Sequence, residues 1–255
     1  MGELYVKAND SLTTVDTLIF AGGIGRRMGL SDRPKQFLEL SGRPIIDYTI
    51  EHFARHPDVS RITVVCLESW IDYLKNYLST RHYTLPIDIV PGGKTGQESI
   101  FLGLNHIHSL GRTERDIVLV HDGVRPLIDA ETISACIQSV ANRGCTATVA
   151  PAIETVIVRN ASQQVTNILD RSHCSLARAP QGFLTEQLYR AHLSAQADKR
   201  GDFVDSISLM AHYGYSIYTV EGPAENIKVT TPTDYYAFRA YMEARDQAHL
   251  LRSDQ

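Results

Sequence analysis

The sequence predicts an α/β fold in which helices cover both faces of a mainly parallel sheet, a doubly wound sandwich. Short apolar runs rich in Ile and Val alternate with amphipathic stretches over residues 17–150. The runs are nearly continuous, as in strands buried on both faces, and the stretches between them have helical spacing. Because parallel strands need a crossover, this alternation indicates repeated βαβ units.

The individual elements follow from this pattern. Strands are expected at 17–21, 61–67, 87–90, 116–120 and 147–150. Helices are expected behind Pro44, where Ile46, Ile50 and Phe53 share one face, and over 99–108 and 130–141. Ligands of such sheets bind beyond the carboxyl ends of the strands.

The alternation ends at Pro151, where the sequence predicts a two-stranded antiparallel ribbon. Residues 153–158 and 165–169 flank a polar turn at 160–162. An isolated ribbon is marginal in water, so we expect it to pack on a second copy of the chain. Further elements are expected in the last part of the sequence: helices over 185–196, 203–213 and 232–244, and a strand over 216–221.

The predicted organisation is therefore one domain over residues 1–246. Residues 151–181 form an arm that leaves it for dimerisation, and the polar ends at 1–14 and 247–255 are expected to be flexible.

Composition excludes several classes of protein. The net charge of −4 and the pI near 6.2 argue against a general nucleic-acid binder. No apolar run approaches the ~18 residues of a transmembrane helix, and the N-terminus lacks the apolar centre of a signal peptide. We expect a cytoplasmic protein that binds neither nucleic acid nor membrane. The cysteines show no C-x-x-C spacing, which favours reduced thiols.

A glycine-rich segment after the first strand carries the strongest functional signal. Gly22, Gly23 and Gly25 can bring backbone N–H groups close to anionic oxygens, and Arg27 and Lys35 add positive charge. Glycines alone fit a plain strand-to-helix turn as well. With the two cations, the segment favours the binding of a nucleoside triphosphate.

Other nucleotide-binding motifs fit less well. No Gly-Lys-Ser/Thr ends the loop, so it is not a P-loop, and Met28 replaces the third glycine of the dinucleotide fingerprint. A nicotinamide-dependent reductase also needs an acidic residue after its second strand, about 20 positions on, whereas Glu68, which follows the strand expected at 61–67, lies about twice as far along. That reductase and a non-catalytic nucleotide-binding module remain the less favoured alternatives.

Two more polar segments follow strands at the same expected edge. Asp122 and Arg125 follow the fourth strand, and a carboxylate there can hold a divalent cation that bridges phosphates, or can merely cap the next turn. Lys228 follows a late strand and is otherwise an ordinary surface lysine. Together Arg27, Lys35 and Lys228 would surround a triphosphate with positive charge.

A series of motifs resembles one family of enzymes. AGGIGRRM, PKQF, PGGKTGQES, HDGVRP, LDRS, APQGF and ENIKVTTPTD occur in this order over residues 16–242. The chain resembles the cytidylyltransferases that include 2-C-methyl-D-erythritol 4-phosphate cytidylyltransferase and ribitol-5-phosphate cytidylyltransferase. The resemblance implies a Rossmann-like nucleotidyltransferase fold, transfer of CMP from CTP to a sugar-alcohol phosphate with Mg²⁺, release of pyrophosphate, and a homodimer joined through the arms.

The resemblance also implies roles for individual residues. Arg27, Lys35 and Lys228 would be catalytic. CTP would contact Ala21, Gly22, Gly23, Gly25, Gly93, Ser99, Asp122, Gly123 and Arg125, with room for the base at Gly96. Asp122 would serve the ribose or bind the metal. The acceptor would meet Arg171, Ala179, Val204 and Asp205, with Arg171 reaching across from the second subunit.

The acceptor side departs from the family pattern. Ala179 and Val204 stand where relatives commonly have threonines, so we expect an altered acceptor preference. Ala-Gly-Gly at 21–23 and Gly-Val at 123–124 favour the ribitol-phosphate branch, which supplies precursors of surface polysaccharides. The methylerythritol enzyme of isoprenoid synthesis is the alternative.

Overall fold

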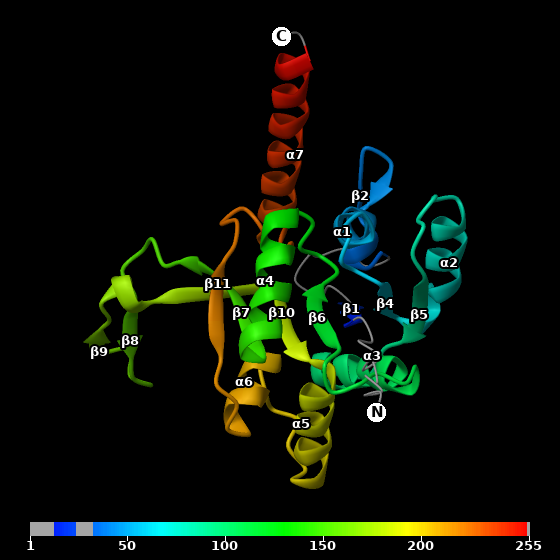
Figure 1. The fold of residues 1–255 in the computed structure, drawn as a ribbon. Helices are drawn as coiled ribbons and strands as arrows, with labels where there is room; N and C mark the ends of the chain where they lie inside the picture. Colours follow the sequence, from blue (N-terminus) through cyan, green and yellow to red (C-terminus); the bar gives the residue numbers. More distant parts are fainter. Residues whose placement is uncertain (1–12, 24–32, 254–255) are drawn as a thin grey trace, which may run out of the picture.

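A sheet of seven strands forms the centre of the protein (Figure 1). The computed structural model describes residues 13–23 and 33–253. The strand order is β11-β7-β10-β6-β1-β4-β5. The strands are β1 (Val15–Ala21), β4 (Arg61–Cys66), β5 (Ile87–Pro91), β6 (Ile117–Asp122), β7 (Cys145–Pro151), β10 (Ser175–Leu184) and β11 (Tyr218–Glu221). Only β10 runs antiparallel to its neighbours, which confirms the mainly parallel sheet.

Helices cover both faces of the sheet, as predicted for a doubly wound fold. One apolar core joins α1 (Ile45–Ala54), α2 (Ile71–Ser79) and α4 (Ala130–Arg143) to the sheet. A second core joins α3 (Gly96–Ser109), α5 (Thr185–Ala197) and α6 (Ser206–His212) to the opposite face. Leu18 and Ile19, adjacent in β1, lie in different cores because successive side chains of a strand point to opposite faces.

Short elements complete the described part of the chain. They are the turns η2 (Lys35–Phe37), η3 (Glu68–Trp70) and η4 (Arg171–His173), the small strands β2 (Glu39–Leu40) and β3 (Arg43–Pro44), and the last helix α7 (Pro232–Ser253). None of the helices in the described residues is both long enough and apolar enough to cross a membrane.

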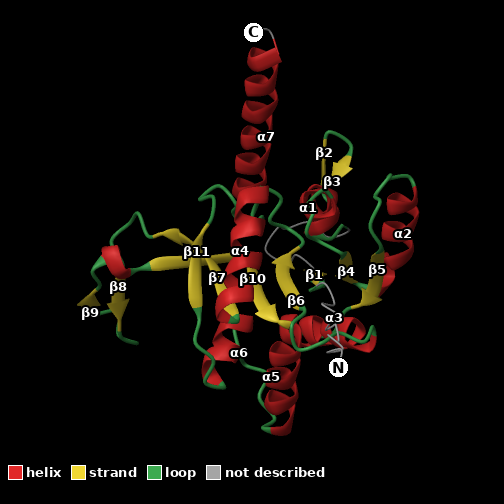
Figure 2. Ribbon diagram, in the orientation of Figure 1, coloured by secondary structure: helices red, strands yellow, loops and turns green. Residues whose placement is uncertain are grey.

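The ribbon predicted after Pro151 is present but shorter than expected. β8 (Ile157–Arg159) and β9 (Val165–Ile168) pair antiparallel in a separate two-stranded sheet. Figure 2 shows this sheet standing away from the main one. Ile157 and Ile168 keep 51% and 64% of their surface exposed, so one chain leaves the apolar face of the ribbon uncovered.

Several element boundaries differ from the sequence-based expectation. α6 begins at Ser206 rather than at residue 203, because Asp205 caps it by accepting from Ser208 N. α7 continues to Ser253 rather than ending near residue 244. α2 was not expected from the sequence.

Strand β10 was also missed, for a physical reason. Pro180 interrupts it, and a proline has no N–H to donate to the ladder. The structure accommodates Pro180 where the pairing with β7 shifts between Ala177 and Gln181. The local sequence therefore does not predict β10, a central strand that is stabilised by pairing with β6 and β7.

Candidate active site

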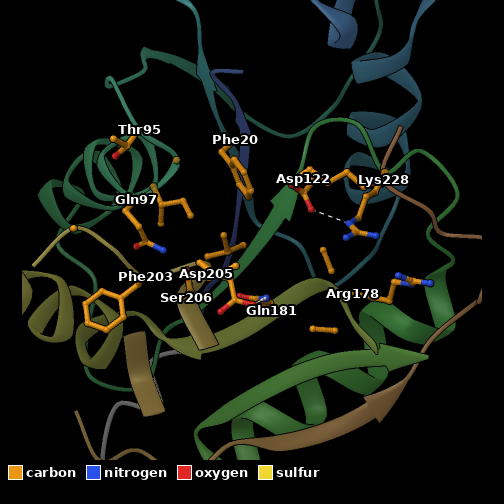
Figure 3. A pocket seen from close by; sticks show the side chains of 18 residues that line it. Phe20, Thr95, Gln97, Asp122, Arg178, Gln181, Phe203, Asp205, Ser206 and Lys228 are labelled. Carbon is orange, nitrogen blue, oxygen red and sulfur yellow. Dashed lines mark hydrogen bonds and ion pairs between the residues drawn. The ribbon is translucent and has the colours of Figure 1, made fainter. Parts of the chain in front are cut away.

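A cavity of about 470 Å³ lies at the carboxyl ends of the central strands (Figure 3). Its walls come from the ends of β1 and β6, the first turn of α3, the outer half of β10, the loop before α6 and Lys228. This is the edge where the sequence places its polar segments, so the fold brings together residues that lie far apart in the chain.

Asp122 lies between two cations at the end of β6. Its Oδ2 accepts from Arg125 Nε at 2.7 Å, and its Oδ1 lies 2.5 Å from Lys228 Nζ. Burial acts to raise the pKa of Asp122, but the charges of Lys228 and Arg125 outweigh it and lower the pKa to about 2. Asp122 is therefore an anion at any working pH, and the predicted Asp122, Arg125 and Lys228 form one cluster.

A buried amide holds this cluster in place. Asn226 Nδ2 donates to the carbonyl of Ala179 at 3.0 Å, and the carbonyl of Asn226 accepts from Arg125 Nη1 at 2.9 Å. Val229 N donates to the carbonyl of Val124 at 2.9 Å. These bonds fix the backbone on both sides of Lys228. Sequence reasoning gave Asn226 no role, although it lies two residues before Lys228 in the same motif.

The start of the glycine-rich segment packs against α3. A Cβ at Gly22 would lie 3.0 Å from Ser99 Oγ, so only glycine fits easily there. A Cβ at Gly23 would lie 4.0 Å from Lys35 Cε, which places Lys35 beside the loop. The carbonyl of Ala21 accepts from Gln36 Nε2 at 2.5 Å, a bond that ties the end of β1 to η2. Ala21, Gly22, Gly23 and Lys35 thus converge as expected.

Two of the predicted residues, Gly25 and Arg27, lie outside the described residues, and their roles stay predictions.

The loop before α3 is shaped by its own side chains. Thr95 caps the helix by accepting from Glu98 N at 3.1 Å. Ser99 Oγ accepts from Gly93 N at 3.1 Å and donates to the carbonyl of Thr95 at 2.9 Å. A Cβ at Gly93 would overlap the side chain of Glu98, so this position requires glycine. The buried Ser99 and the nearby Gly93 thus fix the conformation of the loop. Gly96 lies on the cavity wall with open space around it.

Gly123 packs behind the cavity. A Cβ there would lie 3.1 Å from the Cβ of Ala21, and its N–H donates to the carbonyl of Phe20 at 3.0 Å. Gly123 thus lets β6 and β1 approach closely at the site.

Three of the predicted acceptor residues, Ala179, Val204 and Asp205, lie on the wall of the cavity. Ala179 and Val204 both line the cavity, and the side chain of Val204 is 95% exposed toward solvent. Asp205 caps α6 through Oδ1, and its Oδ2 accepts from Gln181 Nε2 at 3.2 Å. Neither Ala179 nor Val204 has a hydroxyl to donate to a ligand.

Arg171 does not join this group within one chain. It lies exposed on η4 in the arm, and its Nη1 donates to the carbonyl of Ile153 at 2.9 Å. It is absent from the wall of the cavity, which the structure describes. Its predicted role therefore depends on a second subunit.

Sequence reasoning also missed several residues of the wall. They are Phe20, Gln97, Arg178, Gln181 and Phe203. Arg178 directly precedes the Ala-Pro-Gln segment, so its place in the motif was a usable signal. The others depend on packing between distant segments.

Asp122 is the residue that the sequence predicts as a metal ligand, and it lies on the cavity wall. Within residues 13–23 and 33–253, no three His, Cys, Asp or Glu side chains lie close enough to form a metal cage. Mg²⁺ commonly binds through one or two carboxylates and substrate phosphates, keeping several waters. Asp122 fits that mode and not a site built from protein alone.

Comparison with known proteins identifies the family. A family model described as 2-C-methyl-D-erythritol 4-phosphate cytidylyltransferase matches residues 15–244. The chain belongs to this family. It is 42% identical to a ribitol-5-phosphate cytidylyltransferase of Streptococcus agalactiae serotype V, over 91% of this chain and 97% of the relative. It is 43% identical to one of Vibrio parahaemolyticus serotype O3:K6, over 92% and 98%.

Other relatives are named as enzymes that act on the methylerythritol phosphate. A 2-C-methyl-D-erythritol 4-phosphate cytidylyltransferase of Bacillus licheniformis is 35% identical over 90% of this chain and 96% of its own length. The solved 4-diphosphocytidyl-2C-methyl-D-erythritol synthase of Anaerococcus prevotii superposes with a TM-score of 0.77 at 25% identity, covering 91% of this chain and 96% of that one. These matches confirm the predicted family, fold and nucleotidyltransferase class.

Proposed function

We propose that this cytidylyltransferase transfers CMP from CTP to ribitol 5-phosphate, giving CDP-ribitol and pyrophosphate. The observation that carries the proposal is the Asp122 cluster, in which Arg125 and Lys228 bring two cations to the edge where Gly22, Gly23 and Lys35 also lie. The choice of acceptor is supported by the 42–43% identity to ribitol-5-phosphate enzymes, against 35% for the methylerythritol relative.

The chemistry explains why cations matter here. A phosphate oxygen of the acceptor attacks the α-phosphorus of CTP, a new P–O bond forms, and the bond to the bridging oxygen breaks to release pyrophosphate. Both reactants are anions, so catalysis consists mainly of neutralising charge and holding the atoms in line. Lys228 would contact the α-phosphate, Lys35 and Arg27 the phosphates near the glycine loop, and Gly96 would leave room for the base.

Mg²⁺ belongs to the proposal as part of the nucleotide complex. When bound, it would neutralise charge on the CTP phosphates. Asp122 would hold it or the ribose, since its carboxylate is ionised and faces the cavity. Arg125, already bonded to Asp122 and Asn226, would keep that carboxylate in a fixed orientation.

We also propose a homodimer in which each arm delivers Arg171 to the other subunit. The proposal is supported by the exposed apolar side chains of the ribbon, among them Ile157 and Ile168, and by the position of Arg171 outside the wall of the cavity of its own chain. Because the reaction uses CTP, the cytoplasm is the expected location.

Pyrophosphate release tests the proposal. CTP and Mg²⁺ are incubated with ribitol 5-phosphate or with 2-C-methyl-D-erythritol 4-phosphate. The ribitol substrate should give the higher kcat/KM. CTP with Mg²⁺ should also raise the melting temperature, whereas NADPH should not. Stabilisation by NADPH alone, without pyrophosphate release from any acceptor, would contradict the assignment.

The methylerythritol enzyme is the second candidate. The name of the matching family model and the names of the solved relatives favour it. A higher kcat/KM for the methylerythritol substrate in the same assay would decide for it.

A further inference from the structure

Arg178 lies in the cavity without a partner for its buried nitrogen. Its Nε is buried and makes no hydrogen bond within the described residues. It also forms no ion pair there with either acid of the wall, Asp122 or Asp205. Figure 3 shows Arg178 on the same side of the cavity as Asp122 and Lys228, with Phe203 on the opposite side.

The surroundings of Arg178 favour an anionic ligand. Burial lowers the pKa of Arg178, and the nearby charge of Arg125 lowers it further. Asp122 already lies between Arg125 and Lys228, so it does not neutralise Arg178 as well. A buried nitrogen without a partner is unfavourable, and an anion that bonds to it would remove that cost.

The strand register places Arg178 on the β10 side of the cavity, beside the Asp122 turn. Gln181 in β10 pairs with Val120 in antiparallel β6, so the residues before Gln181 run alongside the end of β6 and the Asp122 turn. β6 separates β10 from β1, whose end begins the glycine-rich segment. The nucleotide phosphates are thus expected on the β1 side, and Arg178 lies on the other side, next to Ala179.

We propose that Arg178 binds the phosphate of the acceptor within its own subunit. The inference rests on the proposed cytidylyltransferase function. Ala179, the next residue along β10, supplies no hydroxyl, so Arg178 is the charged donor on this part of the wall. Two parallel N–H groups of a guanidinium match two oxygens of a phosphate, and such charge-assisted bonds are stronger than neutral ones. The dianionic phosphate has oxygens left for Arg171 of a second subunit.

The test compares Arg178→Gln and Arg178→Lys with wild type. Arg115→Gln is the matched control, because Arg115 is exposed and lies outside the cavity. In Arg178→Gln, kcat/KM for ribitol 5-phosphate should fall about 10- to 100-fold, mostly through KM, while KM for CTP stays within about threefold. Arg178→Lys should recover part of the loss, and Arg115→Gln should behave as wild type.

A binding measurement isolates the contribution of the acceptor's phosphate to affinity. Calorimetry with ribitol 5-phosphate and with ribitol gives the affinity that the phosphate adds. That gain should shrink about 10-fold or more in Arg178→Gln and stay unchanged in Arg115→Gln. An unchanged gain, or a rise in KM for CTP equal to that for the acceptor, would overturn the assignment of Arg178. A wild-type chain inactive with every alditol phosphate would instead overturn the proposed function, and this inference with it.

Discussion

Replacing Lys228 by methionine should slow catalysis strongly while leaving the fold almost unchanged. The side chain is 39% exposed, and its ammonium lies 2.5 Å from Asp122 Oδ1. Because Asp122 is buried but keeps Arg125 at 2.7 Å, the loss of stability should be on the order of 1–3 kcal/mol. Removing one group that stabilises charge in the transition state typically lowers the rate by about 10²- to 10³-fold. We expect kcat to fall by that factor and KM for CTP to change less.

Steady-state pyrophosphate release, measured beside thermal unfolding, checks this prediction. Lys75→Met is the matched control, because Lys75 is exposed on α2 and lies outside the cavity. Lys228→Arg keeps the charge and should retain more activity than Lys228→Met. A folded Lys228→Met protein with kcat within about threefold of wild type would refute the catalytic role of this lysine.

Three further predictions concern the loop, the arm and the response to pH. Lys35→Ala should lower kcat about 10²- to 10³-fold with a smaller effect on CTP binding, and near-normal turnover would remove Lys35 from the catalytic group. Mixing an Arg171→Ala chain with a Lys228→Met chain should restore part of the activity, because one site of a mixed dimer then has both Arg171 and Lys228. Confirmed heterodimers without rescue would argue against exchange of arms. Burial lowers the pKa of His192 from 6.5 to about 4, so the unfolded chain takes up its proton first. The stability that neutral His192 contributes is complete above pH 6.5 and falls by about 3 kcal/mol toward pH 4. In urea titrations, the free energy of unfolding of His192→Phe should therefore depend less on pH over this range than that of wild type. Equal slopes for both proteins would contradict that cause.

The sequence was sufficient for the parts of the fold that have local signals. The apolar runs at 17–21 and 61–67 are strands in the structure within a few residues of the predicted bounds, because burial on both faces requires continuous apolar sequence. It was insufficient for β10, where Pro180 breaks the local pattern and stability comes from pairing with β6 and β7. The start of α6 was placed too early because the cap at Asp205 was not recognised.

The same distinction holds for the site. Asp122 and Lys228 were identified because each lies in a motif that follows a strand, and parallel strands bring such motifs to one edge. Asn226 was not predicted, because it acts through hydrogen bonds to Ala179 and Arg125, which lie far from it in sequence. A buried polar side chain of this kind is visible only once the packing is known.

Arg178 shows why the residues that meet the acceptor are harder to predict than those that meet CTP. The groups expected to act on CTP lie in loops that follow strands of the parallel sheet, where topology alone gives their position. Arg178 lies on the one antiparallel strand, next to a break in the pairing, and its position depends on the register between β10 and β6. A substitution of the Arg178 side chain can therefore weaken acceptor binding while the Asp122 cluster stays intact. The residues proposed for acceptor binding and for charge stabilisation on CTP lie on different elements. Arg178→Gln should therefore mainly raise KM for the acceptor, whereas Lys228→Met should mainly lower kcat.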